Sequence, residues 1–191
     1  MIAVLVAAAL LAAPGAGPPV TPEGLRARYG GIRRLEADVV QVKEGKHWAR
    51  PFESRVRLRY TPARVEWETL APLHALAVIE GDALYLVGPD GQRRDMGPMA
   101  GDPRLEAILR FVRALLSVDL PGIERDFALA YGPGELTATP RPGSPLELFT
   151  TVRLRFEADL SIASVDLETR DEKTHLRFER VEQEPAPAAH P

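Results

Sequence analysis

Residues 52 to 91 carry a hydrophobic pattern of period two, and this pattern constrains the fold more than any other feature of the chain. From Phe52 to Tyr60, apolar or small side chains alternate with charged ones, and a second such run is centred on Val65 and Trp67. Successive side chains of a strand point to opposite faces of a sheet, so each run predicts a strand with one apolar and one wet face. The apolar face of such a meander has to be covered or used.

Further strands are expected on both sides of this meander. Residues 76–79 and 83–87 flank a Glu-Gly-Asp turn, which is typical of a hairpin. Strands return from residue 126, and residues 152–178 predict a three-stranded meander. About eleven strands with only two substantial helices predict an antiparallel α+β fold rather than a parallel one.

The first predicted helix has Leu25, Tyr29, Ile32 and Leu35 at helical spacing, over about three turns. The second is stronger, because Asp102 can cap it and Pro103 suits the first helical position. Its apolar stripe is formed by Leu105, Ile108, Leu109, Val112, Leu115 and Leu116. Helix-breaking glycine and proline residues occur at 97–101 and 120–122. They are consistent with a lid hinged at both ends, or with a core helix that simply ends there.

The N-terminal residues differ in kind from the rest. Residues 2–13 are an unbroken apolar run of twelve, followed by a Pro-, Gly- and Ala-rich stretch. The run is too short to span a bilayer, which takes about 20 residues, but it fits the apolar part of a secretory signal. We therefore predict a cleaved signal at 1–17, with a buried helix as the alternative, one domain at 20–184, and a disordered tail at 185–191.

Composition and motifs exclude several function classes. The chain has 191 residues, a net charge of −3 and no cysteine, which disfavours nucleic-acid binding and rules out disulfides and thiol chemistry. Its four histidines lack metal-ligand spacing, and no serine has the context of a nucleophile. Carboxylate pairs such as Glu66/Glu68 and Asp166/Glu168 fit a solvated strand face better than a catalytic pair. We therefore expect no enzyme activity, metal or cofactor.

Taken in order, several segments resemble the LolA-type periplasmic lipoprotein carriers. The segment from Leu25 to Gln41 resembles the family's opening helix and first strand. Ser54 to Trp67 is similar to its two-strand segment, in which an arginine-proline pair precedes an apolar residue and a tryptophan. Residues 72–86 are similar to its next hairpin, and the resemblance extends over residues 23–183 through the order and spacing of these motifs.

The resemblance implies an incomplete, unclosed antiparallel β-barrel of about eleven strands with a helical lid. It also implies a monomeric, non-enzymatic periplasmic carrier that takes lipoprotein acyl chains, or a related lipid, from an inner-membrane exporter to an outer-membrane acceptor. The apolar faces of the predicted strands and helix, taken with the resemblance, predict these lipid-binding residues: Val56, Leu58, Val65, Trp67, Val78, Leu84, Leu86, Leu105, Ile108, Leu109 and Val112.

One departure from the family concerns control of the lid. The family's arginine before proline, which tethers the closed lid, corresponds here to Thr61, with Arg64 or Arg59 as nearby substitutes. A threonine cannot make the multidentate contacts of a guanidinium, so we expect an easier opening and a different cargo or partner. Alternatives are a sensor with the same half-barrel that regulates a membrane protein, an enzyme acting on bound lipid, and a domain with a packed interior.

Overall fold

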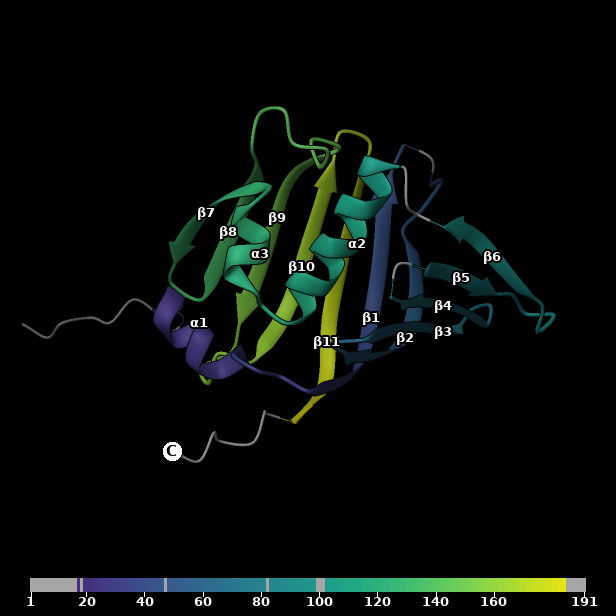
Figure 1. Cartoon of the computed structure of the whole chain (residues 1–191), viewed down its shortest axis with the longest axis horizontal. Helices are drawn as coiled ribbons and strands as arrows, with labels where there is room; N and C mark the ends of the chain where they lie inside the picture. Colours follow the sequence, from purple (N-terminus) through teal and green to yellow (C-terminus); the bar gives the residue numbers. More distant parts are fainter. Residues whose placement is uncertain (1–16, 18, 47, 82, 99–101, 185–191) are drawn as a thin grey trace, which may run out of the picture.

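The computed structural model describes residues 17, 19–46, 48–81, 83–98 and 102–184 (Figure 1). Within them, eleven antiparallel strands form one sheet, in the order β6-β5-β4-β3-β2-β1-β11-β10-β9-β8-β7. The predicted tail and all but the last residue of the predicted signal peptide lie outside the described residues.

The strands are β1 (Arg34–Gly45), β2 (Phe52–Thr61), β3 (Arg64–Ala71), β4 (Ala75–Glu80), β5 (Ala83–Val87), β6 (Arg93–Pro98), β7 (Phe127–Gly132), β8 (Glu135–Pro140), β9 (Phe149–Phe156), β10 (Ile162–Thr169) and β11 (Glu172–Glu184). The helices are α1 (Pro22–Tyr29), α2 (Pro103–Leu116) and α3 (Leu120–Glu124).

The centre of the sheet is made by strands from opposite ends of the sequence. β1 pairs with β11 from Arg34 opposite Glu184 to Gly45 opposite Glu172. Arg180, with φ of 47°, is the unpaired residue of a β-bulge in β11, which lets Phe178 and Val181 both pack against the core. The edge strands β6 and β7 are not paired with each other. The prediction of an unclosed antiparallel barrel with helices is therefore confirmed.

Alternation along the strands separates an apolar inner face from a wet outer face, as predicted. In β2, Val56 and Leu58 are buried, whereas Arg55 and Arg57 are exposed. The outer face carries cross-strand ion pairs such as Arg59 Nη1 to Glu66 Oε2 at 3.0 Å. Exposed pairs of this kind contribute little stability, so burial of the inner face holds the sheet to the helices.

Helix α2 lies across the inner face of the sheet, with α3 beside it (Figure 1). As predicted, it begins after Asp102, whose Oδ1 accepts hydrogen bonds from the backbone N–H groups of Arg104 at 2.9 Å and Leu105 at 3.3 Å. These bonds satisfy donors that a helix start otherwise leaves unpaired. Helix α2 thereby presents its apolar stripe to the inner face.

Two helix predictions need correction. Helix α1 has eight residues rather than three turns, because the chain leaves helical geometry at Gly30 and turns at Gly31, where φ is 76°. Residues 120–122, predicted to be helix breakers that either hinge or simply end the second helix, form the first turn of α3. Pro121 lies in that first turn, where a missing backbone N–H costs nothing.

Candidate functional site

An apolar cavity of about 310 Å³ lies between α2 and the inner face of the sheet. Both halves of the sheet and the helix contribute to its walls. From the sheet, the lining residues are Gln41, Val65, Trp67, Ala77, Ile79, Leu84, Ile162, Val165, Leu167, Leu176 and Phe178, and from α2 they are Leu109, Val112, Leu115 and Leu116.

The walls offer water almost no hydrogen-bond partners. Gln41 is the single polar residue among those that line the cavity in the described chain, and its Oε1 accepts a hydrogen bond from Ser54 Oγ at 3.0 Å. A buried water usually makes about three hydrogen bonds, and apolar cavities of comparable size stay dry and take up hydrocarbon. The cavity is therefore suited to an apolar ligand.

Five of the predicted lipid-binding residues line this cavity: Val65, Trp67, Leu84, Leu109 and Val112. They come from β3, β5 and α2, which are separated in the sequence and converge only in the fold. The inner-face register explains the convergence, because Leu84 lies opposite Ile79 across the β4–β5 pair, and Ile79 lies opposite Val65.

Most of the other predicted residues share the inner face without reaching the cavity. Val56 and Leu58 are 1% and 0% exposed and belong to the packed core. Leu105 and Ile108 are half-buried and pack against that core. Leu86 is 38% exposed, and with Trp67 it lines a separate hollow of about 220 Å³ at the rim.

Val78 is placed on the opposite face of the sheet from the prediction. Its cross-strand neighbours are Glu66 and Tyr85, which belong to the outer face, whereas Ala77 and Ile79 point to the cavity. Residues 75–79 are apolar throughout, so no alternation marks which side chains point inward. Val78 is nevertheless fully buried on its own face.

The sequence analysis did not assign to the site the cavity wall formed by β10 and β11, which we name the far wall. Val165 and Leu167 of β10 and Leu176 and Phe178 of β11 complete the cavity. Their alternation with polar residues predicted the strands but not which wall they form. That assignment depends on β11 returning beside β1, which no local pattern encodes.

In the described structure, the hydrogen bonds and ion pairs found for Thr61 and Arg64, the residues predicted to control the lid, do not involve α2. Thr61 closes the β2–β3 turn, since its Oγ1 accepts from the backbone N–H of Arg64 at 3.1 Å and donates to the Arg64 carbonyl at 3.3 Å. The Arg64 guanidinium binds Glu66 at 2.7 Å and Glu80 at 3.0 Å. These hydrogen bonds raise the pKa of Arg64 above its ordinary value. Arg59 is likewise paired on the outer face.

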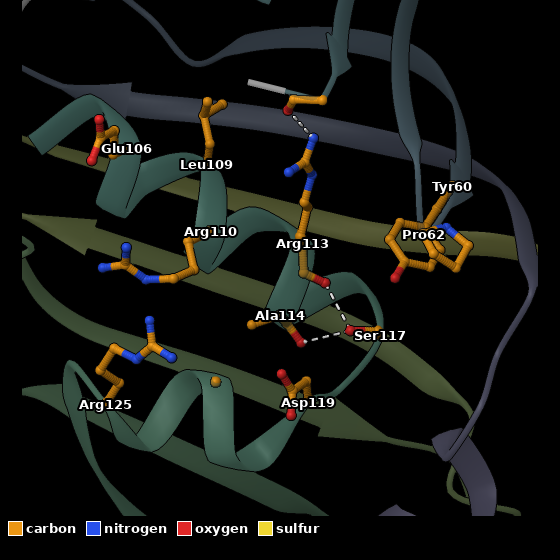
Figure 2. Close-up of a pocket in the computed structure, with 12 residues that line it drawn as sticks. Tyr60, Pro62, Glu106, Leu109, Arg110, Arg113, Ala114, Ser117, Asp119 and Arg125 are labelled. Atoms are coloured by element: carbon orange, nitrogen blue, oxygen red, sulfur yellow. Dashed lines mark hydrogen bonds between the residues drawn. The ribbon is translucent and has the colours of Figure 1, made fainter. Parts of the chain in front are cut away.

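A different arginine joins α2 to the sheet. Arg113 Nη2, on α2, donates to the backbone carbonyl of Gly81 in the β4–β5 turn (Figure 2). The donor therefore comes from the helix and the acceptor from the sheet, the reverse of the tether that the resemblance implied. At the C-terminal end of α2, Ser117 Oγ donates to the Arg113 carbonyl at 2.9 Å. We name the Arg113–Gly81 hydrogen bond the latch.

The titratable groups of the outer face form structural pairs. Asp166, which is buried, binds His175 Nδ1 and Arg155 Nη1, both at 2.7 Å, so His175 is paired rather than merely solvated. Burial acts to raise the pKa of Asp166, but these hydrogen bonds and the positive charge of Arg155 outweigh it and lower the pKa below its usual value.

Within the described residues, no three His, Asp or Glu side chains are grouped so as to hold a metal ion. In the same part of the chain, no helix is both long and apolar enough to cross a membrane.

The fold and the site together define an open antiparallel sheet that curves around an apolar cavity beneath a helix. Two relatives are known by name as outer-membrane lipoprotein carrier proteins. The one from Chromohalobacter salexigens is 28% identical over 155 residues, covering 80% of this chain and 64% of that protein. The one from Dechloromonas aromatica is 29% identical over 164 residues, covering 82% of this chain and 75% of that protein.

The chain is thus a distant relative of the outer-membrane lipoprotein carrier proteins, and the resemblance to the LolA-type carriers is confirmed. It spans less than two thirds of the length of the Chromohalobacter relative. No protein-family model matches the chain.

Solved structures overlap with this one only loosely. A LolA superfamily protein from Nitrosomonas europaea has a TM-score of 0.43 at 9% identity, covering 88% of this chain and 96% of that one. The lipoprotein LppX of Mycobacterium tuberculosis has a TM-score of 0.44 at 13% identity, covering 89% and 100%. The architecture described above rests on the strand pairings of this chain itself.

Proposed function

We propose that this protein is a periplasmic carrier that holds the acyl chains of a lipoprotein, or of a related lipid, in the cavity beneath α2. As a carrier it would perform no chemical step on its cargo. The observation that carries the proposal is the apolar cavity, which the protein's own side chains leave unfilled. The names of the two relatives support it independently.

The energetics favour hydrocarbon as the ligand. Each methylene group removed from water contributes about 0.8 kcal/mol, so one long acyl chain offers on the order of 10 kcal/mol before the costs of binding. Leu84, Leu109 and Val112 supply walls without side-chain polar groups. Binding of this kind is strong without being specific for one chain length.

Loading requires α2 to move. The cavity of about 310 Å³ lies at the lower end of the roughly 300–1,000 Å³ found for ligand pockets. Several acyl chains exceed this volume, so we propose that the structure is the closed form and that α2 is the lid. Opening would break the latch between Arg113 and Gly81 and expose the cavity from the β4–β5 side.

The cellular cycle follows the same proposal. An N-terminal secretory signal would direct export, and the carrier would act as a monomer between an inner-membrane exporter and an outer-membrane acceptor. Mass spectrometry of protein purified gently from its native host tests the cargo directly. A bound lipoprotein or lipid is the expected result, whereas recovery of a single-pass regulatory protein in its place would favour the sensor.

Binding of an apolar, environment-sensitive dye tests the cavity itself. Leu109→Asp and Trp67→Asp each place a charge on the cavity wall, and both variants should lose dye binding. Leu148→Asp is the matched control, because Leu148 is 42% exposed and does not line the cavity. Circular dichroism establishes that each variant is folded. Dye binding that survives both wall substitutions contradicts the proposal.

A further inference from the structure

A second hollow, of about 580 Å³, lies on the other side of α2, and charged as well as apolar residues line it (Figure 2). It is bounded by α2, α3, the β2–β3 turn and the β4–β5 turn. Three of its lining residues are arginines, Arg110 and Arg113 from α2 and Arg125 from the end of α3. We name it the arginine hollow.

Two of these arginines come from different helices. Arg110 lies on α2 and Arg125 at the end of α3, and Figure 2 draws both side chains among the residues that line the hollow. Arg110 Nη2 donates to Asp126 Oδ2 at 3.3 Å. For the Arg125 guanidinium, no hydrogen bond or ion pair with another described residue is found. Like charges repel, so an anion bound in the hollow would offset the repulsion among its arginines.

Two further donors on these walls lack acceptors. The Nε atoms of Arg110 and Arg113 are buried and have no hydrogen-bond partner within the described part of the chain. Buried donors are nearly always paired, and an exception calls for an explanation such as a bound ion. A phosphate or carboxylate supplies several acceptor oxygens, and the planar guanidinium matches both groups in a bidentate manner.

Two carboxylates, Glu106 and Asp119, also line the arginine hollow, and a third, Asp126, lies beside it. Glu106 is itself engaged in an interaction. Asp119 lies at the start of α3, where its Oδ2 is close to Gly122. Asp126 binds Arg110 and also accepts from Ser144 Oγ at 3.4 Å. None of these carboxylates is found in a hydrogen bond or ion pair with Arg125 within the described residues.

The arginine hollow and the apolar cavity adjoin at one residue of α2. Leu109 lines both spaces, from the middle of α2. A ligand that spans them would place a charged group among the arginines and pass hydrocarbon beside Leu109. That is the shape of an amphiphile with one anionic head.

We propose that the arginine hollow binds the anionic head group, phosphate or carboxylate, of an amphiphile whose acyl chain occupies the apolar cavity. The proposal rests on the proposed carrier function and narrows the class of cargo. A neutral acylglycerol would then fill the cavity and leave the arginines without a partner.

Competition with the cavity-bound dye tests this proposal. Lysophosphatidic acid and a monoacylglycerol with the same acyl chain are titrated below their critical micelle concentrations, with inorganic phosphate as a third competitor at constant ionic strength. Lysophosphatidic acid should displace the dye at about tenfold lower concentration than the monoacylglycerol, since hydrogen bonds to charged groups are the strong ones. Arg125→Gln should remove most of that difference and leave monoacylglycerol displacement unchanged.

Arg104→Gln is the matched control, because Arg104 is exposed on the first turn of α2 and lies outside the lining of the hollow. It should retain the tenfold preference. Equal displacement by the two lipids in the unmodified protein overturns the head-group site and leaves the carrier function standing. An equal loss for both lipids in Arg125→Gln also overturns it, as does inorganic phosphate that competes as strongly as lysophosphatidic acid. Failure of the dye and of both lipids to bind at all overturns the carrier function as well.

Discussion

The two flanks of α2 meet the same sheet in opposite ways. On the flank toward β7 and β9, Phe111 stacks with Phe127 at 4.7 Å between ring centroids and contacts Phe149 at 5.7 Å. On the flank toward β3–β5, Leu109 and Val112 face the apolar cavity instead of a packed layer. One flank is filled with aromatic rings, and the other is left open.

The difference teaches how a small helix can belong to the core and still move as the proposed lid. The filled flank includes Ala107, which is fully buried, so it anchors the helix through close packing. The open flank is joined to the β4–β5 turn by the latch between Arg113 and Gly81. A helix anchored on one side and lightly tied on the other can pivot about the anchored side.

Removing the aromatic anchor should have the largest effect on stability. Phe111→Ala is expected to lower the free energy of unfolding by about 3–5 kcal/mol, because it leaves a cavity in a packed cluster. Val112→Ala, one residue further along, borders the existing cavity and should cost less than about 1.5 kcal/mol. Urea denaturation followed by circular dichroism measures both, and similar losses would mean that the two flanks are packed alike.

Larger side chains should also affect the two flanks differently, this time by overfilling the packed flank and occupying the cavity on the open one. Ala107→Leu overpacks the filled flank and should cost about 1–3 kcal/mol. Ala77→Leu projects into the cavity, so it should leave stability nearly unchanged and weaken binding of the apolar dye several-fold. The same denaturation and dye titrations test this pair. Unchanged dye affinity in Ala77→Leu would show that the cavity is not the binding space.

The outer face of the sheet provides a comparison for stability, because residues there pack against neither flank of α2. The pKa of Asp166 is lowered in the folded protein, so its stabilising contribution is present above the unfolded-state pKa of about 3.9 and is lost as pH falls through the folded value. Asp166→Asn should cost about 1–3 kcal/mol at pH 7, and its difference from the unmodified protein should shrink below about pH 4.

Asp38→Asn is the control for this prediction, because within the described residues the ion pairs of Asp38 are long, at 3.9 Å to Arg57 and 3.7 Å to Arg180, and its side chain is 41% exposed. It should change the free energy of unfolding by less than about 0.5 kcal/mol at any pH. A difference for Asp166→Asn that stays constant from pH 7 to pH 3 would contradict the role given to its carboxylate.

Breaking the latch should change stability least and kinetics most. Arg113→Gln removes one exposed hydrogen bond, so the free energy of unfolding should fall by less than about 1 kcal/mol. The rate of dye association should rise several-fold, because opening of the lid no longer breaks that bond. Stopped-flow fluorescence measures the rate, with Arg104→Gln as the control. An association rate equal to that of the unmodified protein would remove the latch from the mechanism.

Local pattern was sufficient to predict much of the fold. Alternation marked the inner faces of β2 and β3, and the Asp102-Pro103 pair marked the start of α2. The short α3 was missed because proline and glycine suggested a break, whereas proline in a first turn is compatible with a helix. Val78 was assigned to the wrong face of the sheet, because a strand that is apolar on both faces shows no alternation of apolar and polar residues.

The site was less predictable than the fold for a physical reason. Its far wall depends on the pairing of β11 with β1, which joins residues far apart in the sequence. Arg113 gave no signal either, since an arginine on the polar side of a helix is usually just solvated. The resemblance to the carriers directed attention to the β2–β3 turn, while the contact with α2 is made at the β4–β5 turn.

The position of β11 between β1 and β10 has a consequence for how the molecule is completed. Until its final strand is in place, the hydrogen-bonded ladder consists of two separate pieces, β1–β6 and β7–β10. A chain shortened before Glu172 would therefore lack the seam that unites them, and folding has to wait for contacts between the two ends of the domain. The sheet is therefore completed at its centre, by β11, rather than at its edge strands β6 and β7.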